Sequence, residues 1–143
     1  MILQFLLAMT AAASFAVLFG VPKEQFFFSS FSGGVGWISY LLFCRLSIGE
    51  VFASLFAAFF LTILSRLFAS IRKNPATLYL VTGIFTLVPG AGIYYASYYF
   101  IMNDMRMFAA KSVETFQIAG AISIGILFGF AIPQKVFYTK KAR

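Results

Sequence analysis

The chain has 143 residues, of which 62% are hydrophobic and 10% are charged, and its formal net charge is +7. Ordinary soluble domains have about 45–50% apolar and 25% charged residues, so a soluble fold of this length could not bury its apolar surface and lipid must cover much of it. Histidine is absent and cysteine occurs once, which excludes a zinc site or a Ser-His-Asp triad. No phosphate-binding or dinucleotide-binding motif occurs either. The composition predicts one membrane domain over residues 1–143 that is not an enzyme and holds no metal or cofactor.

Five apolar stretches are each long enough to cross a bilayer as a helix, which takes about 20 residues. In chain order they cover Ile2 to Phe19, Phe26 to Cys44, Ile48 to Ile71, Thr77 to Met102, and Phe116 to Phe137. They are too long and too continuously apolar for the strands of a membrane barrel. The first stretch lacks the basic start of a signal peptide, because Lys23 is the first basic residue, so we expect it to remain as a spanning helix. The predicted fold class is an all-α integral membrane protein with about five transmembrane helices.

Basic residues gather in alternate gaps between these stretches. Five spans put eight of them on one side and three on the other: Lys23, Arg66, Arg72, Lys73, Lys135, Lys140, Lys141 and Arg143 against Arg45, Arg106 and Lys111. The positive-inside rule makes the first side cytoplasmic, with the N-terminus outside and the C-terminus inside. Basic helix ends suit anionic lipid head groups at the cytoplasmic face, at about 1 kcal/mol each. The isoelectric point near 9.8 reflects these basic residues, and we expect them to contact anionic lipid rather than nucleic acid.

The fourth stretch contains a helix-breaking segment near its middle, with Pro89, Gly90 and Gly92. Proline lacks the amide hydrogen and clashes with the preceding turn, and glycine tolerates unusual dihedral angles. Interrupted helices of this kind form the substrate site of many secondary transporters. A simple proline kink is also common in membrane helices, and the sequence favours neither interpretation. The fourth span is thus predicted to be interrupted at Pro89-Gly90.

Polar residues near this break are candidates for substrate contact. Thr82 and Thr86 lie four residues apart on one helical face, where their hydroxyls either bind substrate or donate back to helix carbonyls. Glu114 is either an exposed acid near a helix N-terminus or the group that holds a substrate ammonium or a coupling proton. Arg66, inside the cytoplasmic end of the third stretch, either extends to the membrane surface or faces the bundle and attracts an anionic group.

Small residues recur where helices could pack closely. In membranes, close backbone approach at such positions drives helix association, so we interpret them as packing surfaces rather than as ligand sites. They are Gly33, Gly34 and Gly36 in the second stretch and Gly120, Gly125 and Gly129 in the fifth.

Several short segments carry a family resemblance: Gly20-Val21-Pro22, Gly33 to Trp37 with Tyr40, Asn74-Pro75-Ala76, Leu87 to Tyr95, Glu114-Thr115, and Ala119 to Gly125. In this order they cover nearly the full chain and resemble the threonine/serine exporter family, in particular the small membrane subunit that corresponds to the C-terminal half of the fused exporters. The resemblance implies export of small hydroxy amino acids across a bacterial inner membrane, with a larger partner subunit of the same family. The chain departs from its relatives at Arg66, near where they often place an acid, and at Thr86, where many have proline.

The sequence therefore predicts a subunit of a secondary transporter that exports threonine, serine or related small amino acids, driven by a proton gradient. The predicted pathway residues are Thr82, Thr86, Pro89, Gly90, Gly92 and Glu114. The alternative is a non-transporting membrane subunit that docks a larger partner. Besides the larger subunit, further copies of the chain are a second kind of expected partner.

Overall fold

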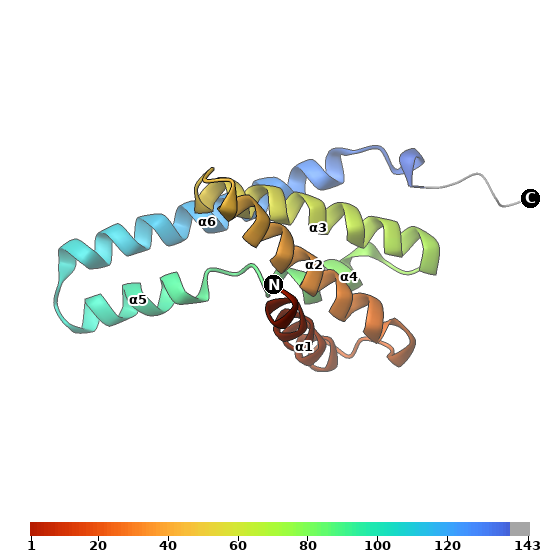
Figure 1. Cartoon of the computed structure of the whole chain (residues 1–143), viewed down its shortest axis with the longest axis horizontal. Helices are drawn as coiled ribbons and strands as arrows, with labels where there is room; N and C mark the ends of the chain where they lie inside the picture. The colour runs from red at the N-terminus through yellow and green to blue at the C-terminus, as the bar shows by residue number, and fades with distance from the viewer. Residues whose placement is uncertain (138–143) are drawn as a thin grey trace, which may run out of the picture.

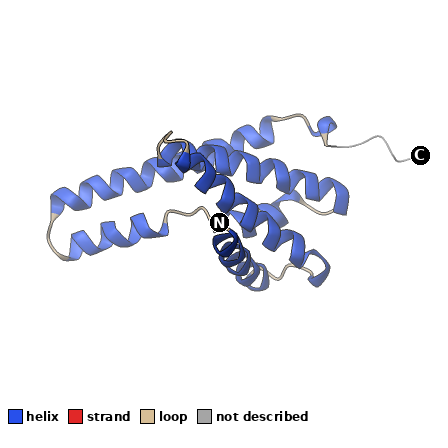
Figure 2. Cartoon of the chain, viewed as in Figure 1, coloured by secondary structure: helices blue, strands red, loops and turns tan. Residues whose placement is uncertain are grey.

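The computed structural model describes residues 1–137, which form α-helices, two short 3-10 helices and no strand (Figures 1 and 2). The elements are α1 (Ile2–Leu18), η1 (Lys23–Gln25), α2 (Phe26–Arg45), α3 (Glu50–Arg72), α4 (Ala76–Ile84), α5 (Gly90–Ile101), α6 (Met105–Ala131) and η2 (Gln134–Val136). The predicted all-helical class is confirmed. Three of the basic residues assigned to the cytoplasmic side, Lys140, Lys141 and Arg143, lie outside the described residues.

Three helices are long and apolar enough to cross a membrane: Lys23–Arg45, which joins η1 to α2, then α3, and then α6. Helix α1 is apolar but shorter, with 17 residues or about 26 Å of length. The fourth stretch is divided between α4, with 9 residues, and α5, with 12. Three of the five predicted spans are thus long apolar helices, and the total of five spans stays a prediction.

Small residues bring the helices together, as the glycine pattern predicted. Gly33 packs directly on Ala12 of α1, and a Cβ added to Gly34 would lie 2.7 Å from the ring of Phe5. Gly125 packs on the backbone carbonyl of Leu55. Gly120 is an exception, because its missing Cβ would meet no atom within 4 Å. Helix packing therefore explains most of the predicted glycine positions but not Gly120.

Contacts along α3 fix the directions of its neighbours. Gly125 of α6 meets Leu55 and Gly129 meets Thr62, so α6 and α3 run in the same direction. Helix α4 runs the opposite way, since Tyr79 packs on Phe68 and Gly83 faces Leu61. The buried apolar core lies between these helices and consists of Ala57, Ala58, Leu61, Leu80, Leu87, Ile118 and Ile122.

The last helix begins earlier and ends earlier than predicted, at Met105 and Ala131 rather than at Phe116 and Phe137. Asn103 adopts a left-handed conformation (φ 59) that turns the chain. The side chain of Asp104 then caps α6 by accepting a hydrogen bond from the Met107 amide at 3.1 Å. Pro133 follows the end of the helix, as is common. With 27 residues, α6 is about 40 Å long.

Because α6 starts early, α5 and the first half of α6 form a helical hairpin that extends beyond the bundle (Figure 1). Within residues 1–137, α5 packs on α6 alone. Apolar and aromatic side chains remain exposed on the hairpin, among them Ile93, Tyr94, Phe100, Ile101 and Phe116. The break at Pro89 lies at the base of this hairpin, where it leaves the bundle.

The orientation is open to a direct test. We predict an N-terminus outside and a C-terminus inside, because most basic residues fall on the side of the C-terminus. Reporter fusions at each end, one active only outside and one only in the cytoplasm, should give opposite signals. An inside signal from both ends would mean an even number of spans and would contradict the five-span arrangement.

Candidate functional site

Pro89 ends α4 by local geometry. Its φ and ψ of −75 and 61 are those of an inverse γ-turn, which the Gly90 amide closes by donating to the Val88 carbonyl at 2.7 Å. Before it, the amides of Thr86 and Leu87 donate three residues back, which tightens the last turn of α4. A continuous helix would force the proline ring against the carbonyl of Phe85. The predicted interruption is therefore present, and it covers residues 85–89.

The two glycines after Pro89 serve a different purpose from the one predicted. Neither has a positive φ, so unusual dihedral angles do not explain them. Gly92 packs directly on Thr115, and a side chain there would push α5 away from α6. A Cβ added to Gly90 would meet no atom within 4 Å. Gly92 thus allows close helix packing, and Gly90 leaves open space beside the break.

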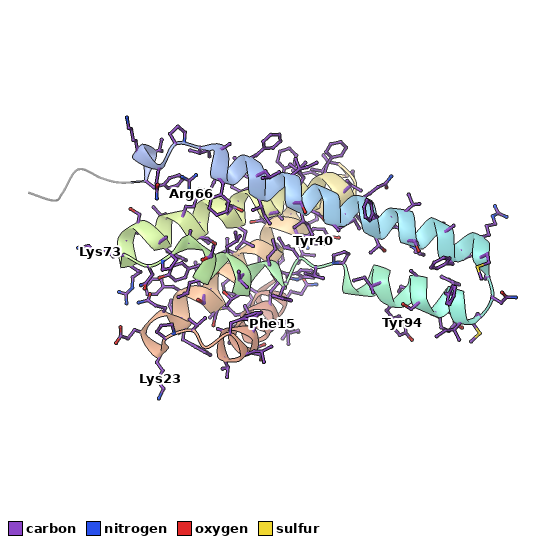
Figure 3. The ribbon with its side chains drawn as sticks, turned by 180° about the vertical axis from the view of Figure 1, so that it is seen from behind. Phe15, Lys23, Tyr40, Arg66, Lys73 and Tyr94 are labelled. Carbon is purple, nitrogen blue, oxygen red and sulfur yellow. The ribbon has the colours of Figure 1, made fainter. Side chains whose placement is uncertain are left out.

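A cavity of about 470 Å³ lies at this position, lined by residues of α2, α3, the break, α5 and α6. Its volume falls in the range of roughly 300–1,000 Å³ that is usual for small-molecule sites. Its polar side chains are those of Tyr40, Glu50, Ser54, Thr86, Tyr95, Lys111, Glu114 and Thr115. Figure 3 labels Tyr40 near the junction of the bundle and the hairpin.

The charged residues in the cavity are two carboxylates and one ammonium group. The Nζ atom of Lys111 lies 2.8 Å from Oε2 of Glu114, one turn away on the same helix. The Glu50 carboxylate makes no hydrogen bond or ion pair with any other group in residues 1–137, although the hydroxyl of Ser54 donates to its backbone carbonyl at 2.8 Å. Glu50 is therefore the carboxylate that is available to a ligand.

The N-terminus of α5 lies at the same cavity. The first turn has no side-chain cap, and the Ile93 amide bonds to the Pro89 carbonyl. The amides of Ala91 and Gly92, which line the cavity, donate to no carbonyl in the described chain. Free amides at a helix N-terminus, together with the helix dipole, favour an anionic group.

The two predicted threonines have different surroundings. Thr86 lines the cavity; its hydroxyl lies 2.7 Å from the Gly83 carbonyl and 3.2 Å from that of Gly33. Thr82 is fully buried, does not line the cavity, and donates to the Tyr79 carbonyl at 3.0 Å. The structure thus brings together Thr86, Pro89, Gly90, Gly92 and Glu114 and leaves Thr82 outside.

Sequence reasoning missed six polar residues of the cavity: Tyr40, Glu50, Ser54, Tyr95, Lys111 and Thr115. Lys111 entered only the count of basic residues on each side. A carboxylate at the first residue of a long apolar helix was the available signal for Glu50. Nothing in the sequence indicates that the start of α3 and the start of α5 line the same cavity.

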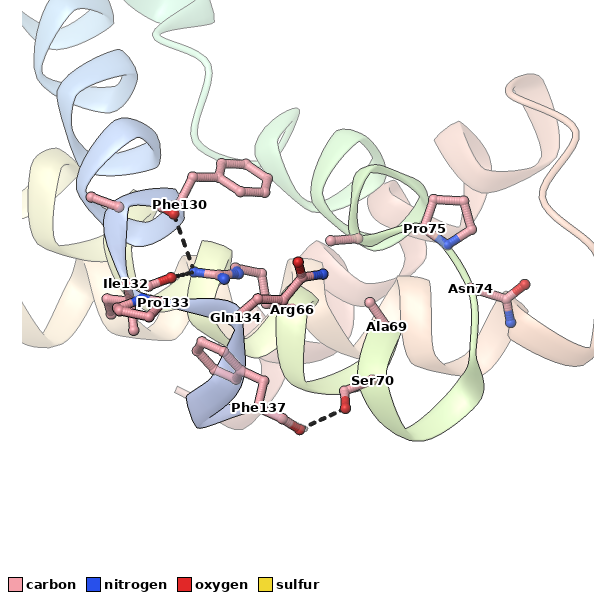
Figure 4. Close-up of a pocket in the computed structure, with 12 residues that line it drawn as sticks. Arg66, Ala69, Ser70, Asn74, Pro75, Phe130, Ile132, Pro133, Gln134 and Phe137 are labelled. Carbon is pink, nitrogen blue, oxygen red and sulfur yellow. Dashed lines mark hydrogen bonds between the residues drawn. The ribbon is translucent and has the colours of Figure 1, made fainter. Parts of the chain in front are cut away.

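Of the two roles considered for Arg66 from the sequence, extension to the membrane surface is wrong. Arg66 is 7% exposed, and its Nη1 atom donates to the carbonyls of Gly129 and Ile132, each at 2.7 Å. These carbonyls lie at the end of α6, where the helix lacks intrahelical donors and the dipole favours a cation. Arg66 therefore caps α6 (Figure 4).

An apolar helical bundle whose divided helix lies at a polar cavity is an arrangement found in membrane transporters. Residues 4–132 match the family model described as threonine/serine exporter, ThrE, and the chain belongs to that family. This confirms the resemblance drawn from the ordered motifs. The chain matches no curated protein and no solved structure.

Proposed function

We propose that the chain is a subunit of a multi-pass secondary transporter that exports threonine, serine or related small amino acids across a bacterial inner membrane. The observation that carries the proposal is the cavity of about 470 Å³ at the break of the fourth apolar stretch. It combines free helix amides, an unpaired carboxylate and hydroxyl groups. These are the partners that a small hydroxy amino acid needs.

Each part of such a substrate has a counterpart in the cavity. Its carboxylate fits the free amides of Ala91 and Gly92 at the positive end of α5. Its ammonium group fits the carboxylate of Glu50. Its hydroxyl can donate to the oxygen of Thr86, because a hydroxyl oxygen accepts hydrogen bonds while its own hydrogen is donated elsewhere.

The same arrangement supports proton coupling. Lys111 forms an ion pair with Glu114 at 2.8 Å, whereas Glu50 lies beyond ion-pair distance of any basic residue within residues 1–137. A carboxylate of this kind can exchange a proton for a substrate ammonium. We therefore assign the coupling role to Glu50. We assign to Glu114 the role of balancing the charge of Lys111 at the cavity wall.

The exposed surface of the hairpin supports a role for partners. Ile93, Tyr94 and Phe100 are more than half exposed and have no helix other than α6 beside them in residues 1–137. A larger membrane subunit of the same family would cover this surface and supply the other half of the transporter, and anionic lipid would neutralise the basic face. Docking alone, the competing function, uses the same surface but assigns no role to the cavity.

The two threonines provide the test of the proposal. In cells that express the chain with the larger subunit, Thr86→Val should raise the KM for efflux of labelled threonine about two- to tenfold, because one hydrogen bond to substrate is lost. Thr82→Val changes the same residue type one turn earlier but outside the cavity, so it should leave KM unchanged. Efflux that is identical without the chain, or equal KM values for both variants, would favour the docking function.

A further inference from the structure

A second cavity, of about 600 Å³, lies at the start of α4, whereas the candidate substrate site lies beyond its end. Residues of α3, the α3–α4 connection, the end of α6 and η2 line it. Its polar lining consists of Arg66, Ser70, Asn74 and Gln134 (Figure 4). Helix α4 thus extends from one cavity to the other.

Arg66 is the charged residue of this lining, and no carboxylate neutralises it within residues 1–137. The backbone carbonyls at the end of α6 stabilise it, and the ring of Phe137 lies 4.5 Å from its Cζ atom. These groups carry partial charges only. The site therefore keeps a net positive charge that a bound monoanion would balance.

The guanidinium has unused donors on one edge. All its hydrogen bonds to described residues come from Nη1, to the carbonyls of Gly129, Ile132 and, at 3.4 Å, Phe130. Neither Nε nor Nη2 is fully buried, and Arg66 lines the cavity. Nε and Nη2 carry two parallel N–H bonds, which is the geometry that binds a carboxylate through both of its oxygens.

We propose that this cavity binds the carboxylate of a free amino acid on Nε and Nη2 of Arg66. That the amino acid is the exported substrate rests on the function proposed above. One planar fork with one charge suits a carboxylate. Sites for phosphate head groups instead gather several lysine or arginine residues, and Arg66 has no other basic residue beside it in this lining. The site would hold the substrate at the expected cytoplasmic end of α4, before it reaches the break.

Thiol labelling of the purified protein in nanodiscs tests the site without transport. Cys44→Ala removes the one native thiol, and Ala69→Cys places a reporter in the cavity wall. Threonine and N-acetylthreonine should slow alkylation of this thiol, whereas threoninol, which lacks the carboxylate, should not. Arg66→Lys keeps the charge but loses the fork, so about tenfold more ligand should be needed for the same protection.

Two further variants separate binding from folding. Lys135→Gln removes an exposed charge beside the cavity without changing its lining and should leave protection unchanged. Gln134→Trp fills the cavity from η2 while the bonds between Arg66 and α6 remain, so it should abolish protection even if Arg66→Lys fails to fold.

Three results would overturn the proposal. The first is equal protection by threoninol, and the second is unchanged protection in both Arg66→Lys and Gln134→Trp. The third is protection that depends on the anionic lipid of the nanodisc rather than on added carboxylate, which would make the cavity a head-group site. Because the assay does not measure efflux, the proposed function can fail in cells while this site stands, and the reverse holds as well.

Discussion

Replacing Pro89 and Gly90 together by alanine is expected to abolish export of threonine and serine while the protein still inserts and assembles. In a helix interior, alanine is more favourable than proline by about 3 kcal/mol and than glycine by about 1 kcal/mol. The variant should therefore join α4 and α5 into one helix. The amides of Ala91 and Gly92, which have no carbonyl partner in the described chain, would bond to carbonyls four residues earlier. The donors offered to a substrate carboxylate would disappear.

The measurement is efflux of labelled threonine or serine from cells with matched membrane levels of the protein. Amide hydrogen exchange at Ala91 and Gly92 should slow in the variant, which reports the joined helix independently of transport. Pro22→Ala is the matched control, since Pro22 lies in the exposed connection between α1 and α2. Undiminished efflux with slowed exchange would show that the break only bends a packing helix.

The break could be predicted from sequence because its cause is local. Proline has no amide hydrogen to donate, and its ring clashes with the carbonyl four residues earlier in a helix, whatever surrounds it. The glycine motifs could be predicted for a similar reason, since a residue without a side chain marks a close backbone approach, as at Gly33 and Gly125. Gly120 shows the limit of that argument, because the pattern does not say which glycines of a helix face a neighbour.

The composition of the cavity could not be predicted, because it depends on which helix ends meet. Thr82 and Thr86 look equivalent in the sequence, yet α4 ends at Ile84, between them, so that Thr86 lies in the break and this threonine alone reaches the cavity. The start of α6 was missed because Met105 to Val113 is more polar than the stretches around it. The cap at Asp104 allows a helix there, and its packing on α5 supports it.

Arg66 illustrates the same difficulty with a charge. From the sequence, an arginine inside an apolar stretch should seek the surface or an acid. The structure provides instead the carbonyls at the end of α6, some 63 to 66 residues later in the chain. The partner of a buried charge in this bundle is therefore a helix end, which no residue type in the sequence identifies.

Glu50→Gln is expected to reduce proton-driven efflux by about tenfold or more, because a hydrogen bond to a charged group contributes about 1.5–3 kcal/mol. Glu114→Gln should have a smaller effect, since Lys111 already neutralises Glu114 at 2.8 Å. Glu24→Gln is the control, as Glu24 is exposed and does not line the cavity.

Exchange of labelled for unlabelled threonine, without a proton gradient, distinguishes two roles of Glu50. Glutamine mimics a protonated carboxylate, so if Glu50 carries only the coupling proton, exchange should persist while net efflux is lost. If Glu50 holds the substrate ammonium, exchange and efflux should fall together, with a raised KM. Efflux by Glu50→Gln equal to that by Glu24→Gln would contradict both roles. It would leave Glu50 as an acid that stabilises the first turn of α3, where a negative charge is favourable in any helix.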